Sequence, residues 1–197
     1  MAALSRICPW WLAPTLDNPI RRLVHNPEKI LRRYIREGDT VLDLGCGSGT
    51  FTIAIAKMVG EEGRVIAVDL QEKMLEILRK KAAKEELSSR ITTHRSEADQ
   101  IGISDRVDFA LAFYMVHEVA DQGRFFREVA SLLKEDASLL ISEPKFHVSK
   151  SAFRRMKEAA EGAALTPTDE PKIRFSRSLV LRRNGVSLPR SASFGLI

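Results

Sequence analysis

The fold of this chain is constrained most strongly by a predicted strand that enters a helix through closely spaced glycines. Residues 40–44 are a mostly apolar run typical of a buried strand, and residues 51–59 have the pattern of a helix. Between them stand Gly45, Gly47 and Gly49, at alternate positions. Glycine lets the main chain adopt positive φ angles and lets a ligand approach it closely. A glycine-rich turn between a strand and a helix is typical of nucleotide-binding sites.

The spacing of these glycines narrows the class of ligand. A dinucleotide fingerprint needs Gly-x-Gly-x-x-Gly, but Thr50 stands where its third glycine would be. The sequence instead reads Asp43-x-Gly45-x-Gly47-x-Gly49, with an acid at the end of the strand. This pattern resembles motif I of the class I S-adenosylmethionine-dependent methyltransferases. A carboxylate suits the ammonium and sulfonium charges of that cofactor. The alternative is an ordinary strand–turn–helix with permissive glycines.

A second acid follows at the expected distance. Residues 64–69 are a predicted strand that ends in Asp69, twenty positions after Gly49 (69 − 49). An acid at the end of the second strand of a βαβ unit accepts hydrogen bonds from ribose hydroxyls, and the resemblance implies this role for Asp69. Capping of the next helix is the alternative, and both roles are compatible. By position in the motifs, we also assign cofactor contacts to Cys46, Leu70 and Phe113.

A third acidic signal follows the short strand predicted at residues 91–94. Ser96-Glu97-Ala98-Asp99 resembles the family's acidic dipeptide, where an acid side chain and a neighbouring backbone N–H contact adenine. We assign these contacts to Glu97 and Ala98. Asp99 is the rival acid, and a solvated loop carboxylate is the alternative for either.

The methyl acceptor is expected at the end of the fourth strand, predicted at residues 107–113. Ligands of open α/β sheets lie outside the carboxyl ends of the strands, so Tyr114, His117 and Glu118 fall beside the acceptor. The passage resembles that of small-molecule methyltransferases, including those that methylate quinone carbons. We predict Tyr114 and His117 as catalytic, with His117 as a base if the acceptor must lose a proton. A purely structural histidine is the alternative.

The alternation of strands and helices predicts an α/β fold with a parallel sheet. The resemblance implies a Rossmann-like, doubly wound sheet of seven strands, mostly parallel with an antiparallel last strand, and helices on both faces. Further helices are expected at 27 to about 36, 71–86, 123–133 and 149–164, and further strands at 137–142, 165–169 and 174–183.

The length of 197 residues, of which 44% are hydrophobic, favours one domain with a substantial core. We expect the methyltransferase domain at residues 38–184, a helical segment at 1–37 and a mobile tail at 185–197. The adjacent Trp10 and Trp11 are interpreted either as a lid over the acceptor or as packing residues.

The formal net charge of +5 permits an anionic partner, but the basic residues are dispersed. A small organic acceptor is therefore the leading prediction, with transfer of a methyl group to tRNA or rRNA as one alternative. A non-catalytic module that binds S-adenosylmethionine is the other. The sequence after the fourth strand lacks the Pro-Pro-aromatic and Pro-Cys motifs of base-methylating enzymes.

Two cysteines, Cys8 and Cys46, provide no disulfide framework, which favours a reducing cytoplasm. No second ligand stands at a suitable spacing from Cys8, so no metal site is predicted. No apolar run is long enough to span a bilayer. Arg6 and Pro9 interrupt the only stretch that could form a secretory signal.

Overall fold

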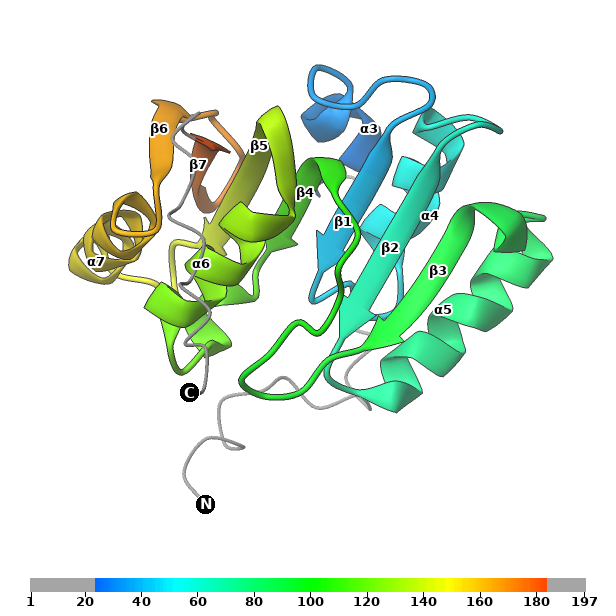
Figure 1. Cartoon of the computed structure of the whole chain (residues 1–197), viewed down its shortest axis with the longest axis horizontal. Coiled ribbons are helices and arrows are strands. Elements are labelled where there is room, and N and C mark those ends of the chain that lie inside the picture. The colour runs from blue at the N-terminus through cyan, green and yellow to red at the C-terminus, as the bar shows by residue number, and fades with distance from the viewer. Residues whose placement is uncertain (1–23, 184–197) are drawn as a thin grey trace, which may run out of the picture.

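The computed structural model describes residues 24–183, which fold around one seven-stranded sheet (Figure 1). The strand order is β3-β2-β1-β4-β5-β7-β6. Strands β1 to β5 are parallel, while β7 pairs antiparallel with both β5 and β6. The predicted fold class, with its antiparallel last strand, is confirmed. The strands are β1 (Thr40–Leu44), β2 (Arg64–Asp69), β3 (Ile91–Arg95), β4 (Val107–Phe113), β5 (Leu133–Pro144), β6 (Leu165–Asp169) and β7 (Ser176–Arg183).

Helices cover both faces of this sheet (Figure 1). Alternate residues of a strand point to opposite faces, so Leu42 and Leu44 pack with α6 and α7 whereas Val41 packs with α3, α4 and α5. The central strands are buried on both sides, which explains why they read as nearly continuous apolar runs. The helices are α3 (Pro27–Leu31), α4 (Thr50–Met58), α5 (Glu72–Lys84), α6 (Gln122–Leu132) and α7 (Lys150–Glu161), with short 3-10 helices η3 (Ser88–Arg90) and η4 (Val116–Glu118).

The parallel register brings the motif-bearing strand ends together at one edge of the sheet. Leu44 lies between Val68 of β2 and Ala112 of β4. The turn after β1 therefore lies beside the end of β2 and beside the segment that follows β4. Strand β1 is central, at the point where the strand order reverses, which is where α/β sheets bind ligands.

Two elements differ from their sequence prediction. Helix α3 ends at Leu31 rather than near residue 36, because the chain then turns and lays the Tyr34 ring on that of Phe109, with centroids 5.5 Å apart. Strand β5 begins at Leu133 rather than at residue 137. Its charged first residues hid this extension, which pairs Leu133 with Val107 before a shift in register.

Several sequence predictions lie outside the described residues. These are the interpretations of Cys8, of Trp10 and Trp11, and of the tail at 185–197. Between residues 24 and 183, no helix has both the length and the apolar character that a membrane span requires.

Packing of α5 against the glycine turn gives a test of the fold. Gly49 has φ +88°, and a Cβ there would lie 2.3 Å from Cδ1 of the buried Leu78. Gly38 has a similar φ of +85°, but no described atom lies within 4 Å of its Cβ position. Gly38→Ala should cost about 1–2 kcal/mol of conformational strain. Gly49→Ala should cost about 1–3 kcal/mol more, because the buried leucine must shift. Urea unfolding of both variants measures the difference, and equal losses would show that α5 does not constrain the turn.

Candidate active site

The glycine turn after β1 is tied to the end of β2 by Asp69. The Asp69 carboxylate is 8% exposed and accepts the backbone N–H groups of Gly47 and Gln71, each at 2.8 Å. The Cys46 N–H also donates to the Val68 carbonyl at 3.0 Å. Burial raises the pKa of Asp69, and the backbone donors oppose this shift. Asp69 thus holds the glycine turn in place and connects it to Gln71, the residue that precedes α5.

Asp43 is a second buried carboxylate at this edge. Its side chain is 2% exposed and accepts the Thr52 hydroxyl at 2.6 Å. Burial raises the pKa of Asp43 to about 7, against the hydrogen bond from Thr52 and with a further contribution from the charge of Asp69. Among residues 24–183, no cationic side chain forms an ion pair with Asp43. A cation bound here would compensate a costly buried charge.

In the turn after β1, neighbouring atoms crowd the Cβ position of Gly45 but not that of Gly47. A Cβ on Gly45 would lie 2.7 Å from the Met115 Cβ, so this glycine is required by packing. Gly47 has φ +55°, and its Cβ position has no described atom within 4 Å. A ligand can therefore approach the backbone at Gly47 closely.

The loop after β3 reaches the same edge. The Ser96 N–H donates to the Asp69 carbonyl at 3.1 Å, and Glu97 and Gln100 then exchange backbone hydrogen bonds of 3.0 and 3.4 Å. Both candidate acids are exposed, but Asp99 forms an ion pair with Arg124 at 2.9 Å. Asp99 thus has a partner on α6, and the assignment of Glu97 to the cofactor stays a prediction.

His117 lies beyond the end of β4, in η4, and is held by a carboxylate from the neighbouring strand. Glu143, at the end of β5, is fully buried. Its Oε1 accepts the Val116 N–H at 2.8 Å, and its Oε2 hydrogen-bonds His117 Nδ1. Burial lowers the pKa of His117, but the hydrogen bond and charge of Glu143, with the charge of Glu118, raise it above its ordinary value. The side chain is 26% exposed, and its Nε2 has no hydrogen-bond partner among the described residues.

Tyr114 faces a different group of residues. Its hydroxyl hydrogen-bonds the Ser176 Oγ at 2.8 Å and the His25 Nε2 at 3.2 Å, and its ring stacks on Phe113 at 4.5 Å. Tyr114 has φ +63°, unusual for a bulky residue. The structure therefore places Tyr114 and His117 at the same strand end without bringing the hydroxyl to the imidazole. The Phe113 ring is buried against Phe51, 4.3 Å away.

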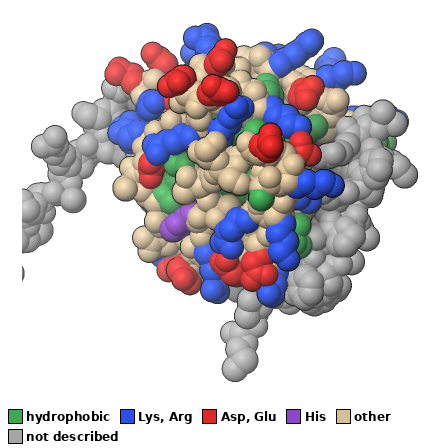
Figure 2. All heavy atoms as spheres, turned by 90° about the vertical axis from the view of Figure 1, so that its right-hand side faces the viewer, with side chains coloured by type: hydrophobic (Ala, Val, Ile, Leu, Met, Phe, Trp, Pro, Cys, Tyr) green, Lys and Arg blue, Asp and Glu red, His purple; other side chains and the backbone are tan. Residues whose placement is uncertain are grey.

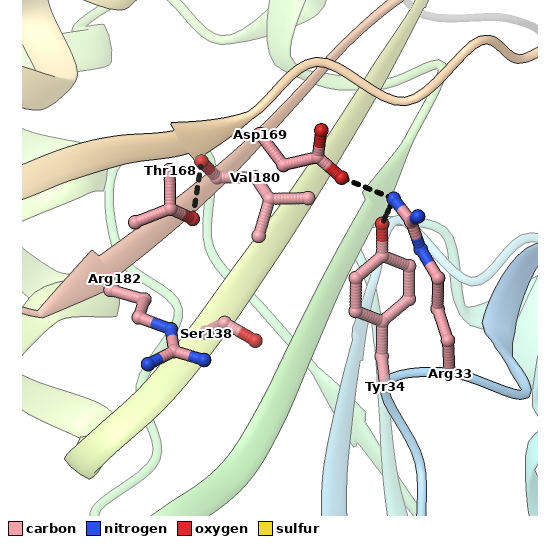
Figure 3. Close-up of a pocket in the computed structure, with 7 residues that line it drawn as sticks. All are labelled: Arg33, Tyr34, Ser138, Thr168, Asp169, Val180 and Arg182. Carbon is pink, nitrogen blue, oxygen red and sulfur yellow. Dashed lines mark hydrogen bonds and ion pairs between the residues drawn. The ribbon is translucent and has the colours of Figure 1, made fainter.

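A separate pocket lies away from the carboxyl ends of the strands (Figure 3). Ser138, opposite Arg182 in the β5–β7 ladder, is six residues before Pro144 (144 − 138), which is about 20 Å along a strand. On one side of the pocket, Arg33 points toward Asp169 and the Tyr34 hydroxyl and donates hydrogen bonds to both. None of the predicted site residues lines it; its walls are Arg33, Tyr34, Ser138, Thr168, Asp169, Val180 and Arg182.

The geometry agrees with the comparison with protein families. A family model described as a methyltransferase domain matches residues 35–174. The chain belongs to this family. The predicted membership of a methyltransferase family is thereby confirmed.

Curated and solved relatives agree with this assignment. The demethylmenaquinone methyltransferase of Lactobacillus johnsonii is 34% identical over 110 residues, which cover 55% of this chain and 45% of that protein. The ubiquinone/menaquinone biosynthesis C-methyltransferase UbiE of Escherichia coli is 29% identical over 55% of this chain and 44% of its own length. The chain thus spans about half the length of these curated relatives. A crystal structure of an S-adenosylmethionine-dependent methyltransferase from Aquifex aeolicus has a TM-score of 0.80 and 27% identity, over 89% of this chain and 99% of that one.

One further solved structure shares the fold alone. The [4+2]-cyclase SpnF has a TM-score of 0.70 and 15% identity, over 83% of this chain and 82% of its own. The architecture by itself therefore does not specify a reaction.

The sequence analysis missed two residues of this site. Glu143 directly follows the strand predicted at residues 137–142, and an acid at the carboxyl end of a strand is the same signal that identifies Asp43 and Asp69. Thr52, the hydroxyl partner of Asp43, lies inside a helix with an apolar pattern. Nothing in the sequence marked it.

The raised pKa of Asp43 predicts how stability depends on pH. Because the folded protein keeps a proton on Asp43 up to about pH 7 and the unfolded chain releases it near ~3.9, the contribution of Asp43 to stability is lost as pH rises between these values. Asp43→Asn, which cannot ionise, should become more stable relative to the wild type by on the order of 2–4 kcal/mol from pH 4 to pH 8. Urea unfolding without cofactor at several pH values measures this. A stability difference that does not change with pH would show that Asp43 ionises normally.

Proposed function

We propose that this protein transfers the methyl group of S-adenosylmethionine to a small organic acceptor that must lose a proton, of the hydroquinone or phenol type. The observation that supports this most strongly is the His117–Glu143 pair beside the cofactor edge, because it can hold a base next to the acceptor. The names of the curated relatives, which act on demethylmenaquinone or in ubiquinone and menaquinone biosynthesis, point to the same class of acceptor.

The donor groups at the carboxyl edge fit the cofactor. Asp43, buried without a cationic partner, would balance the ammonium group. The carboxylate oxygens of Asp69 retain acceptor sites for ribose hydroxyls beyond the backbone donors that they already bind, among them the N–H groups of Gly47 and Gln71. When bound, S-adenosylmethionine supplies an activated methyl group on its sulfonium. We assign its binding to Asp43, Gly45, Cys46, Gly47, Gly49, Asp69, Leu70, Glu97, Ala98 and Phe113.

His117 would act as the general base. Its Nδ1 faces the Glu143 carboxylate, which fixes the proton on Nδ1 and leaves the Nε2 lone pair for the acceptor. Transfer in line with the leaving sulfur then depends on alignment of the acceptor and exclusion of water. Since the hydroxyl of Tyr114 is engaged by His25 and Ser176, we assign Tyr114 to shaping the wall of the site rather than to proton transfer.

The two alternatives predict different surfaces and behaviour. Acid and basic side chains are interspersed over α5 and β3, which is unlike a continuous nucleic-acid groove (Figure 2). In a module that only binds the cofactor, the buried Glu143 carboxylate that orients the partly exposed His117 would have no functional role.

An acceptor screen tests the proposed function. The full chain is incubated with S-adenosylmethionine and with short-chain naphthoquinols, catechols, simple phenols or transcribed tRNA, and release of S-adenosylhomocysteine is measured. We expect turnover with a quinol or phenol. Turnover with tRNA alone would identify a nucleic-acid enzyme. Cofactor binding without turnover of any acceptor would support the non-catalytic module.

The role of the His117–Glu143 pair gives a sharper prediction. His117→Gln and Glu143→Gln should each lower kcat about 10²–10⁴-fold, because the first removes the base and the second, through the donating amide, favours the wrong tautomer. Cofactor affinity, measured by calorimetry, should change little. Since the two residues act as a unit, the double variant should lose little more than either single one.

Glu118→Gln is the matched control, because Glu118 contributes charge to His117 but no hydrogen bond to its ring. It should lower kcat less than about ten-fold. In the wild type, kcat should rise with pH through the raised pKa of His117, and Glu143→Gln should shift this inflection to lower pH. Full kcat in Glu143→Gln would show that the carboxylate has only a structural role.

A further inference from the structure

Two loops beyond the end of β5 form one surface, which we call the two-loop surface. The first, between β5 and α7, is residues 145–149, and the second, between β6 and β7, is residues 170–175. Pro144 pairs with Ser176 in the ladder, and the Lys145 N–H donates to the Phe175 carbonyl at 2.9 Å. The loops are therefore held side by side by main-chain hydrogen bonds.

Each loop carries an exposed phenylalanine. Phe146 is 74% exposed and Phe175 is 51% exposed, and among residues 24–183 no other large hydrophobic side chain is exposed to a comparable degree. Phe175 also adopts φ +59°, a conformation that is costly for a bulky residue. Its ring lies 4.9 Å from the Arg174 guanidinium. The backbone of Phe175 is therefore in a strained conformation, and its apolar ring is exposed to solvent beside a cation.

The charges of the two loops are mostly positive. The only acid in them is Glu170, which starts the second loop and forms an ion pair with Lys157 of α7 at 3.5 Å. None of their basic residues forms an ion pair with a described residue, in contrast to Arg79 and Lys73 on α5, which pair with acids of the same helix. The basic residues are Lys145, Lys172 and Arg174, and Lys150 follows at the start of α7.

A row of rings connects this surface to the base. The Phe146 ring lies 5.1 Å from that of His147, and the His147 ring stacks on that of His117 at 6.1 Å. The exposed apolar side chain is thus two rings away from the imidazole that Glu143 orients. What binds at the two-loop surface lies at the rim of the acceptor site.

We propose that the two-loop surface docks the protein on a lipid bilayer that carries anionic headgroups. Aromatic side chains insert at the boundary between headgroups and acyl chains, and nearby cations are attracted by the negative surface potential. The basic residues are confined to two short adjacent loops with the phenylalanines among them. This arrangement suits a headgroup layer better than an extended phosphate backbone, which needs a groove that tracks the strand. Docking would bring the acceptor rim to the membrane, so that a lipophilic acceptor could enter from it; this second step rests on the proposed function.

Vesicle binding by the full chain tests the docking. Vesicles of phosphatidylcholine alone are compared with vesicles of equal parts phosphatidylcholine and phosphatidylglycerol, by sedimentation at several salt concentrations. The wild type should bind the anionic vesicles, and added salt should weaken the binding. Phe146→Ser with Phe175→Ser, and Lys145→Glu with Arg174→Glu, should each lower the partition coefficient about ten-fold or more.

Lys80→Glu with Lys84→Glu is the matched control, with the same charge change on exposed residues of α5. It should bind anionic vesicles within about three-fold of the wild type, and thermal unfolding should show that all variants are folded. Absence of binding to anionic vesicles, or an equal loss in the control, would overturn the proposal. So would binding of single-stranded RNA through the same four side chains without binding of vesicles.

A second readout separates this proposal from the proposed function. With an acceptor embedded in anionic vesicles, both two-loop variants should lose turnover, whereas turnover of a short-chain, water-soluble acceptor should be unchanged. Vesicle binding without turnover of any acceptor leaves the docking in place and refutes the proposed function. Turnover of the embedded acceptor that is unaffected by the variants refutes entry of the acceptor from the membrane at this rim.

Discussion

The burial of two carboxylates at the carboxyl edge of the sheet is the constraint on which the site depends. Asp69 is satisfied by the chain itself, because it accepts backbone N–H groups from the turns after β1 and β2. Asp43 is satisfied only in part, by the hydroxyl of Thr52. Asp69 fixes the turn through its hydrogen bonds, whereas Asp43 is a buried carboxylate without a cationic partner among the described residues. Burying a negative charge costs free energy. At the carboxyl ends of the strands, this cost accounts both for the hydrogen bonds that fix the glycine turn and for the proposed preference for a cationic ligand.

The other half of the site depends on contacts between strands rather than on a local motif. Glu143 reaches His117 because β4 and β5 are parallel neighbours that end together. A related fold can host a cyclase, so the architecture fixes where a ligand lies and not what happens to it. In the proposed site, the residues assigned to the reaction lie at or after the ends of β4 and β5, while most residues assigned to the cofactor lie at or after the ends of β1 to β3.

The sequence predicted what is local and missed what is not. The Asp43 to Gly49 spacing requires one strand, one turn and one helix, so it can be recognised without a partner. The ends of α3 and β5 were misjudged because they are set by tertiary contacts, the stacking of Tyr34 on Phe109 and the pairing of Leu133 with Val107. For the same reason, nothing in the order of residues revealed that Tyr114 and His117, three positions apart (117 − 114), have different partners.

The packing of α5 against the glycine turn determines which parts of the fold would respond to a bound ligand. Leu78 fills the space against Gly49, and the Lys81 ammonium donates to the Ser48 carbonyl at 2.9 Å, one helical turn farther along. Any rearrangement of the turn must therefore move α5, whose Arg79 hydrogen-bonds the Thr93 hydroxyl of the edge strand β3. A change in the turn on ligand binding would in this way reach strand β3. The slowing of amide hydrogen exchange on cofactor binding would then extend along α5 and into β3, well beyond the residues that touch the ligand.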